Sequence, residues 1–220
     1  MLFDLRSRGR RRTVQVVYVG LAVLIGAGLV LFGVGTGSGG GGLFGAFTGS
    51  NSSGGNGVTS QVKKAVAQTK KSPSSASAWA SLVQARFAAA NTVGYDNATS
   101  TYTTTGKQQL KLLTQAYTRY AALVKTPAVT PATLAAKAYT QNSDWQNASA
   151  TYQAVLAVQK PTSVHTLECV ALTAYAAKND RVAQLAQARA LAKLPKTSRK
   201  QIKSELEQAK TSTTIVTGSC

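Results

Sequence analysis

The stretch that decides the fold is PATLAAKAYTQNSDWQNASATYQAVLAVQKP, from Pro131 to Pro161. Its two halves are rich in residues that favour helices, and the short polar run between them is a turn that ends in a capping aspartate. The stretch therefore predicts a hairpin of two helices, at 131–141 and 145–159, which the closing proline terminates.

The same unit follows once more along the chain, with helices predicted at 163–178 and 181–194. Matched landmarks on the first helices and at the turns stand 36 residues apart, Tyr139 with Tyr175 and Asp144 with Asp180. A two-helix unit at this spacing predicts an array in which neighbouring hairpins bury a common core.

Helices are also expected on both sides of these two units. The apolar spacing predicts them at about 58–71, 73–90, 107–124 and 197–210. The polar, threonine-rich stretch 91–106 is interpreted as an unusually long connection. Residues 211–220 are expected to form a short, loose tail unless Cys220 fixes it in place.

At these landmarks the sequence resembles the tetratricopeptide repeat (TPR) family. The family places bulky and small residues and a Tyr on the first helix, Ala and an aromatic on the second, and then a Pro. The middle unit carries this pattern at Ala136, Tyr139, Ala148, Tyr152 and Pro161. The last unit matches at Ala171, Tyr175 and Pro195 but departs from the pattern at Leu172, Gln184 and Ala188. The first unit, split by residues 91–106, keeps Trp79, Leu82, Ala116 and Tyr120.

The resemblance, which covers about 73–210, implies an all-α fold of stacked antiparallel helix pairs. The repeat domain is placed at 58–210. In the family, a concave groove is lined by the first helix of each pair and binds partners. Carried onto this sequence, the lining residues are Gln84, Phe87, Thr133, Lys137, Thr140, Cys169, Thr173 and Ala176. Such a neutral-to-basic groove suits an acidic peptide or a C-terminal carboxylate; the alternative is that these side chains simply face solvent.

A long apolar run, TVQVVYVGLAVLIGAGLVLFGV at Thr13–Val34, has no charged residue and is long enough for a transmembrane helix. The arginines before the run predict that this end of the chain stays in the cytoplasm. These residues are Arg6, Arg8, Arg10, Arg11 and Arg12. A retained anchor is favoured over a cleaved signal peptide, because the run is longer than a signal core and no small-residue cleavage pattern follows it. Residues 1–12 are then a basic cytoplasmic tail, and the Gly/Ser-rich residues 35–57 a flexible linker.

The charge of the chain concerns its partners rather than its fold. Lys and Arg number 25 against 7 Asp and Glu, a formal net charge of +18. This balance indicates anionic lipid, acidic polymer or nucleic acid as partners, or else a solvated lysine surface without a role. Nucleic acid is disfavoured, since the domain is expected outside the cytoplasm and its tyrosines occupy repeat core positions rather than a stacking surface.

The two cysteines, Cys169 and Cys220, allow either a disulfide or two thiols. His165 and Cys169 stand four residues apart on one helix face, as in a thiolate–imidazole pair or half a metal site. Because the chain has a single histidine, a buried cysteine beside a histidine at the edge is favoured. The sequence thus predicts no catalytic residue, no metal and no cofactor, and the protein is not expected to be an enzyme.

The combined interpretation is a single-pass membrane protein with an extracytoplasmic TPR-like domain. It is expected to bind a protein or peptide partner at the outer face of the membrane, in secretion or envelope assembly. Its basic start, anchor and Gly-rich tether also resemble membrane-tethered TPR proteins of high-GC Gram-positive bacteria. The alternative is a basic surface module that binds anionic polymer, lipid or nucleic acid. The sequence indicates neither the identity of the partner nor the oligomeric state.

Overall fold

The computed structural model of the chain describes residues 54–220, and this part is almost entirely helical, which confirms the all-α class. Its helices are α3 (Gly54–Lys71), α4 (Ala76–Val93), α5 (Thr104–Leu123), α6 (Val129–Gln141), α7 (Trp145–Val158), α8 (Val164–Ala176), α9 (Asp180–Lys193), α10 (Lys196–Gln208) and α11 (Thr214–Ser219). Two short strands, β1 (Tyr95–Asp96) and β2 (Thr101–Tyr102), pair as an antiparallel hairpin.

The predicted anchor at 13–34 lies outside the described residues, as does most of the predicted linker. The same holds for the orienting arginines, Arg6, Arg8, Arg10, Arg11 and Arg12. Among residues 54–220, no helix is both long enough and apolar enough to cross a membrane.

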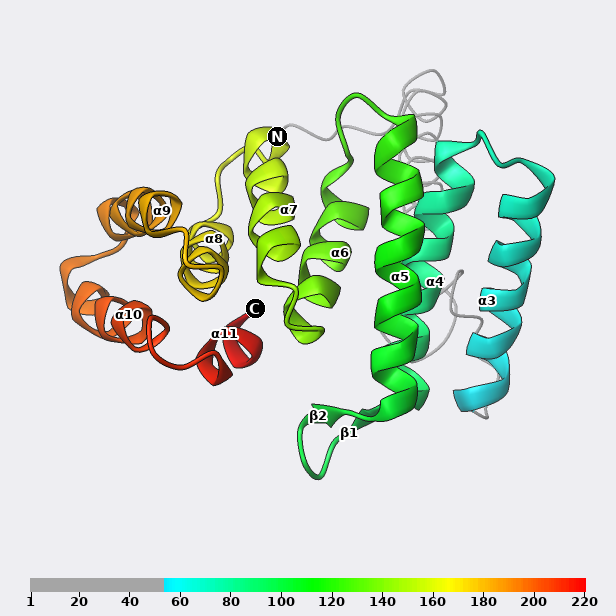
Figure 1. The fold of residues 1–220 in the computed structure, drawn as a ribbon, viewed down its shortest axis with the longest axis horizontal. Coiled ribbons are helices and arrows are strands. Elements are labelled where there is room, and N and C mark those ends of the chain that lie inside the picture. The colour runs from blue at the N-terminus through cyan, green and yellow to red at the C-terminus, as the bar shows by residue number, and fades with distance from the viewer. Residues whose placement is uncertain (1–53) are drawn as a thin grey trace, which may run out of the picture. The chain divides into compact units, whose positions relative to one another are not determined.

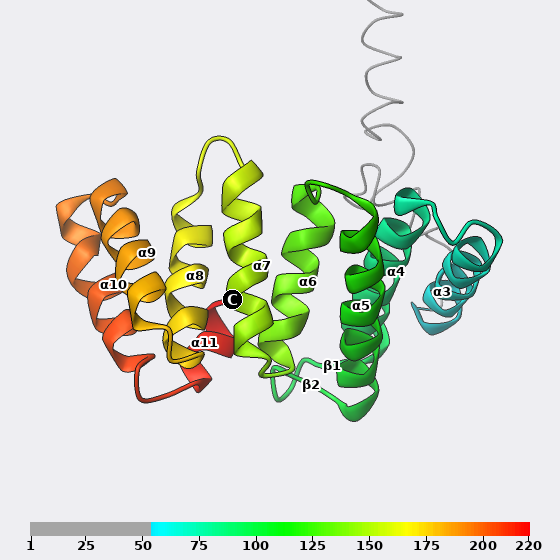
Figure 2. The same cartoon turned by 45° about the horizontal axis from the view of Figure 1, so that its top comes forward.

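The helices follow one another in a row, each packed against the next from α3 to α10 (Figures 1 and 2). Contacts between alternate helices join α4 to α6 and α8 to α10. The even-numbered helices therefore share one face of the row. The last helix, α11, leaves the row and turns back onto this face, where it packs against α8 and α6.

The structural repeat is 35 residues long, one less than the landmarks predicted. Helices α6 and α8 both have 13 residues, α7 and α9 both have 14, and each pair starts 35 residues apart. The turns agree, because Ser143 and Lys178 both have positive φ and the next residues, Asp144 and Asn179, both cap a helix. The predicted match of Asp144 with Asp180 was wrong by one position.

Two predicted boundaries also differ from the structure. Helix α3 begins at Gly54, inside the stretch 35–57 that was predicted as flexible linker. The stretch 91–106 is more ordered than a long connection: α4 continues to Val93, and the β1–β2 hairpin then leads into α5. The Tyr95 and Tyr102 rings pack edge to face with their centroids 5.1 Å apart, and this contact closes the hairpin.

The apolar core has two centres along the row. One lies among α3 to α7 and includes Leu82, Leu110 and Leu113, all buried. The other surrounds α8 and includes Tyr175, Leu206 from α10 and Val216 from α11. Because α11 contributes to this second core and Cys220 is bonded to Cys169, residues 211–220 are part of the domain, as the sequence predicted for the case in which Cys220 fixes the tail.

Candidate functional site

The most distinctive site is the face of α6 and α8 on which α11 packs, here called the groove. Residues 211–220, here called the tail segment, cover part of it (Figures 1 and 2). The groove and the tail segment lie at the predicted concave side, that of the first helix of each pair. The chain's own segment therefore occupies the position where a partner was expected.

One apolar side chain anchors the tail segment. Val216 is completely buried, and it belongs to the same packed cluster as Ala136 of α6, Cys169 of α8 and Leu206 of α10. Burying a valine side chain contributes about 1.5–3 kcal/mol. The neighbouring Ile215 is only partly buried against the same cluster.

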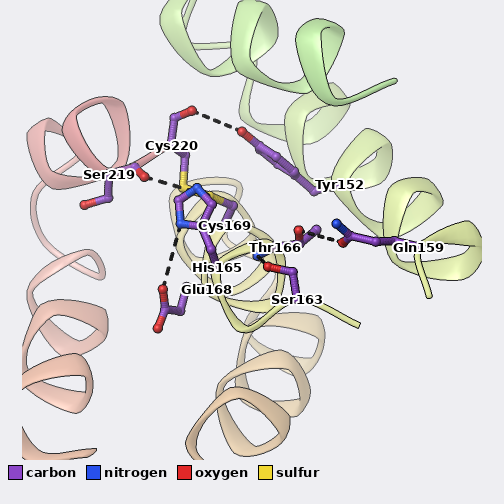
Figure 3. A network of polar contacts seen from close by, with 9 residues as sticks. All are labelled: Tyr152, Gln159, Ser163, His165, Thr166, Glu168, Cys169, Ser219 and Cys220. Carbon is purple, nitrogen blue, oxygen red and sulfur yellow. Dashed lines mark hydrogen bonds and ion pairs between the residues drawn. A yellow bond between two sulfur atoms is a disulfide. The ribbon is translucent and has the colours of Figure 1, made fainter. Parts of the chain in front are cut away.

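Two side chains beside the groove, Gln141 at the end of α6 and Tyr152 of α7, hold the main chain of the tail segment. Gln141 Nε2 donates a hydrogen bond of 2.8 Å to the carbonyl oxygen of Thr217. The Tyr152 hydroxyl donates to the main-chain oxygen of Cys220 at 3.1 Å (Figure 3). Both acceptors are backbone atoms, so these bonds do not depend on the identity of the side chains in the tail segment.

A disulfide between Cys169 and Cys220 locks the tail segment in place. The Cα atoms are 5.7 Å apart, which is within the usual range for a bridge, and the bond closes a loop with a sequence separation of 51. Cys169 is completely buried, whereas Cys220 is half-buried. Of the two alternatives left open by the sequence, the structure has the bridged form.

His165 lies beside the disulfide without forming a catalytic pair. Its Nε2 is 3.7 Å from the Cys169 sulfur, and its Nδ1 is 4.0 Å from a carboxylate oxygen of Glu168 (Figure 3). Partial desolvation, helped by the positive charge of Lys137 on α6, lowers the pKa of His165, although much of the side chain is exposed, and this favours the neutral imidazole. With its sulfur in a disulfide, Cys169 is no nucleophile here, and residues 54–220 contain no metal-binding cluster.

Polar contacts fix the start of α8, which positions Cys169 and His165. The Ser163 hydroxyl caps the helix by accepting from the Thr166 amide, and the Thr166 hydroxyl donates to Gln159 at the end of α7 at 2.9 Å (Figure 3). Gln159, Ser163 and Thr166 thus join the end of one repeat to the start of the next.

The structure brings together only some of the predicted lining residues. Lys137 and Thr133 are half-buried on the groove face of α6. Thr140 and Thr173 are completely buried, and their hydroxyls donate to carbonyl oxygens of their own helices. On α4, Gln84 is half-buried, and Phe87 packs against the first core centre.

The one-residue error in the repeat explains the differences on α8. A period of 35 makes Glu168 and Leu172 the equivalents of Thr133 and Lys137, in place of Cys169 and Thr173. Glu168 and Leu172, together with His165, line a small pocket of about 20 Å³ beside Ser219 of the tail segment. Ala176 is half-buried at the end of α8. Gln141 and Val216 were not predicted as site residues, since nothing in the local sequence shows that the tail folds back.

A second hollow, of about 520 Å³, lies between α4 and α5. Its lining combines apolar, uncharged polar and cationic side chains, namely Trp79, Leu82, Arg86, Leu112, Gln115, Ala116, Thr118 and Arg119. Arg86 donates from Nη1 to Gln109 at 2.7 Å, while its buried Nε has no acceptor among the described residues. Burial lowers the pKa of the Arg86 guanidinium, which remains charged at pH 7.

No acidic side chain is available to neutralise these arginines from their own part of the chain. Asp96 is the only acidic residue in the sequence between Gly54 and Ser143. Its carboxylate accepts the Ala98 amide within the hairpin, and this bond is the main cause that lowers the Asp96 pKa. The hollow is therefore lined by two arginines, and no carboxylate of residues 54–220 is part of its lining.

Comparison with protein-family models gives no match for this chain. Searches of curated proteins and of solved structures find no match either.

Proposed function

We propose that this protein is a membrane-anchored adaptor of the tetratricopeptide type that binds a peptide segment of a partner protein in its groove. Three features support the repeat assignment: consecutive helix pairs, a 35-residue period and the landmark residues Tyr139, Ala148 and Tyr152. The observation that carries the binding proposal is the tail segment itself. It packs on the face of α6 and α8 through one apolar anchor, and its backbone accepts two hydrogen bonds, from Gln141 of α6 and Tyr152 of α7, as a bound peptide would.

The site of action follows from the run Thr13–Val34 and the arginines before it. Their pattern favours a helix that crosses the membrane with the repeat domain on the outer side. Protease added to intact cells should then remove the repeat domain, whereas a cytoplasmic control protein survives. Survival of the domain under these conditions would contradict the proposed topology.

Crosslinking from the groove tests peptide binding. A photo-crosslinking residue at Lys137, half-buried on α6, should capture a partner in intact cells, whereas the same residue at Arg189, exposed on α9, should not. Adding Thr133→Arg places a long charged side chain one turn away on the same helix and should abolish the capture. Equal capture from both positions, or capture that survives Thr133→Arg, would contradict a binding site in the groove.

The hollow with Arg86 and Arg119 favours a second candidate function, the binding of an anionic polymer. Its buried Arg86 Nε lacks an acceptor, and an anion would supply one. Polyglutamate is a suitable probe, measured at rising salt because such binding weakens with ionic strength. The pair Arg86→Gln and Arg119→Gln should weaken binding more than the pair Arg181→Gln and Arg189→Gln, which removes the same charge from exposed positions on α9. Equal weakening would mean that diffuse charge, not this site, binds the polymer.

A further inference from the structure

We propose that the tail segment, residues 211–220, is a ligand of the groove held in place by its disulfide, and that the groove accepts an uncharged partner segment with a β-branched aliphatic anchor once a dithiol opens that bond. The proposal rests on the proposed peptide-binding function and names both the chemistry of the partner and the step that controls access.

The contacts of the tail segment define the class of peptide that fits. Gln141 and Tyr152 bond to backbone oxygens, which every peptide has. The only completely buried side chain in α11 is that of Val216. Selectivity is therefore expected at this anchor position, where a β-branched residue of the same size fits.

The charge of the partner follows from the same geometry. The tail segment, TSTTIVTGSC, has no charged side chain. The groove beside it has charges of both signs, with Lys137 near His165 and with Glu168 close to Glu205 of α10. Burial, and then the charge of Glu205, raises the pKa of Glu168, so this pair is already poorly placed for a further negative charge. An uncharged segment is therefore favoured over the acidic peptide expected from the sequence.

The disulfide keeps a competing segment from entering. A tethered ligand acts at an effective concentration in the millimolar range, and a covalent bond adds to this advantage. A partner in solution therefore competes poorly until the bond opens. Because Cys169 is completely buried and Cys220 is half-buried, the attack of an incoming thiolate is expected at the Cys220 sulfur.

The opening step is a two-electron thiol–disulfide exchange. A thiolate of the dithiol bonds to Cys220 Sγ and the Cys169–Cys220 bond breaks, which leaves a thiolate on Cys169. That thiolate takes up from water the proton that the attacking thiol had released on ionising, and His165 Nε2, 3.7 Å away, is placed to relay it. The second thiol of the dithiol then displaces Cys220 as its thiol. The dithiol ends as a disulfide, and the chain ends with two reduced cysteines.

The test measures how well a segment covers Cys169. In the full chain carrying Cys220→Ser, Cys169 is the only cysteine, and its alkylation rate reports how often the groove is uncovered. We expect slow alkylation in this chain. Adding Val216→Asp should accelerate it at least about tenfold, because a buried carboxylate expels the anchor. A synthetic peptide of residues 211–220 carrying Cys220→Ser should slow the reaction again, and the same peptide with Val216→Asp should not.

A comparison of oxidised and reduced wild-type chain tests whether the disulfide controls access to the groove. The labelled peptide should bind the chain treated with dithiothreitol about 100-fold more tightly than the oxidised chain, measured by fluorescence polarisation. Circular dichroism checks that each variant remains helical, and Val216→Ser replaces Val216→Asp if the latter does not. Failure of the peptide to protect Cys169 in a helical variant overturns the proposal, as does equal binding by oxidised and reduced chain.

The two proposals fail in different ways. Capture from Lys137 without protection of Cys169 by the peptide would leave the adaptor function standing and refute the tail as its ligand. Protection of Cys169 without any capture from Lys137 in cells that carry Cys220→Ser, where no disulfide holds the tail segment, would show a groove that serves only its own tail, and would refute the adaptor.

Discussion

At the scale of single residues, Gly94 and Gly106 bring the end of α4 against the start of α5. A Cβ added to Gly94 would lie 2.6 Å from the Gly106 nitrogen, and a Cβ added to Gly106 would lie 2.8 Å from the Gly94 carbonyl carbon. Both distances are too short for a real contact. The Gly94 carbonyl also accepts the amide of Thr103 at 2.9 Å. Only glycine allows this approach, which turns the chain through the β1–β2 hairpin.

Gly94→Ala and Gly106→Ala are each expected to lower the free energy of unfolding by about 1–3 kcal/mol, because backbone must move to admit the methyl group. Gly57→Ala and Gly218→Ala are matched controls, since a Cβ at either position meets nothing within 4 Å. Urea denaturation of the four variants measures the difference. Equal effects at all four positions would contradict a steric role for the close approach.

Tyr117 makes the stability sensitive to alkaline pH. Burial, with smaller effects of Tyr139 and Tyr120, raises the pKa of Tyr117 to about 12, against an ordinary value near 10. Between pH 10 and 12 the unfolded chain loses this proton and the folded chain keeps it, so folding stability falls as the pH rises. Tyr117→Phe should therefore reduce the drop in thermal midpoint between pH 8 and pH 11. An unchanged drop would show that Tyr117 is not among the groups responsible.

At the scale of helices, the repeat is defined most sharply by its turns. Residues Ser143 and Lys178 adopt positive φ, and the side chains of Asp144 and Asn179 then accept the amides of Asn147 and Val182 at 3.3 Å. These caps satisfy amides that the first turn of a helix leaves without partners. Polar residues at the two turns thus set the starts of α7 and α9.

Asp144→Ala and Asn179→Ala should each cost about 1 kcal/mol of stability, the usual loss for a side-chain cap. The control is Thr213→Ala before α11, because the Thr213 side chain makes no capping bond. Thermal unfolding of the three variants provides the comparison. A loss of equal size at Thr213 would mean that capping is not the cause.

For the domain as a whole, the tail segment links helices that are far apart in the sequence within the second core centre. It runs from α10 back to α8 and α6, with the disulfide closing a loop of sequence separation 51. The entropy of an unfolded chain falls when such a loop is closed. The disulfide therefore stabilises the domain, in addition to holding the tail segment over the groove.

Cys220→Ser should lower the free energy of unfolding by up to about 4 kcal/mol, from the loop-closure entropy for this separation. Reduced wild-type protein should show a similar loss in guanidinium denaturation, and Cys220→Ser should be insensitive to reductant. A loss below about 1 kcal/mol would indicate that the unfolded chain is already restricted without the bond.

The local pattern predicted much of the fold, and its errors were local as well. Helix formers broken by prolines and capped turns located each helix from α4 to α10 to within a few residues. The predicted period was wrong by one residue because Tyr175 was matched to Tyr139 by residue type. In the structure Ala174 is the equivalent of Tyr139, since the carbonyl of each accepts the amide of the residue that caps the next helix. An error of one residue turns a helical side chain by about 100°, which moved the predicted lining from Glu168 to Cys169.

Periodicity, caps and prolines act between near neighbours, and they were enough to predict paired helices over residues 58–210. The sequence left open whether Cys169 and Cys220 are joined, and with this whether residues 211–220 are fixed or loose. The return of α11 onto α6 and α8 is seen only in the folded domain. That contact joins residues more than 60 positions apart through Gln141, Tyr152 and Val216. Its free energy comes from burial against a surface that exists only after the repeats have stacked, so no local pattern can encode it.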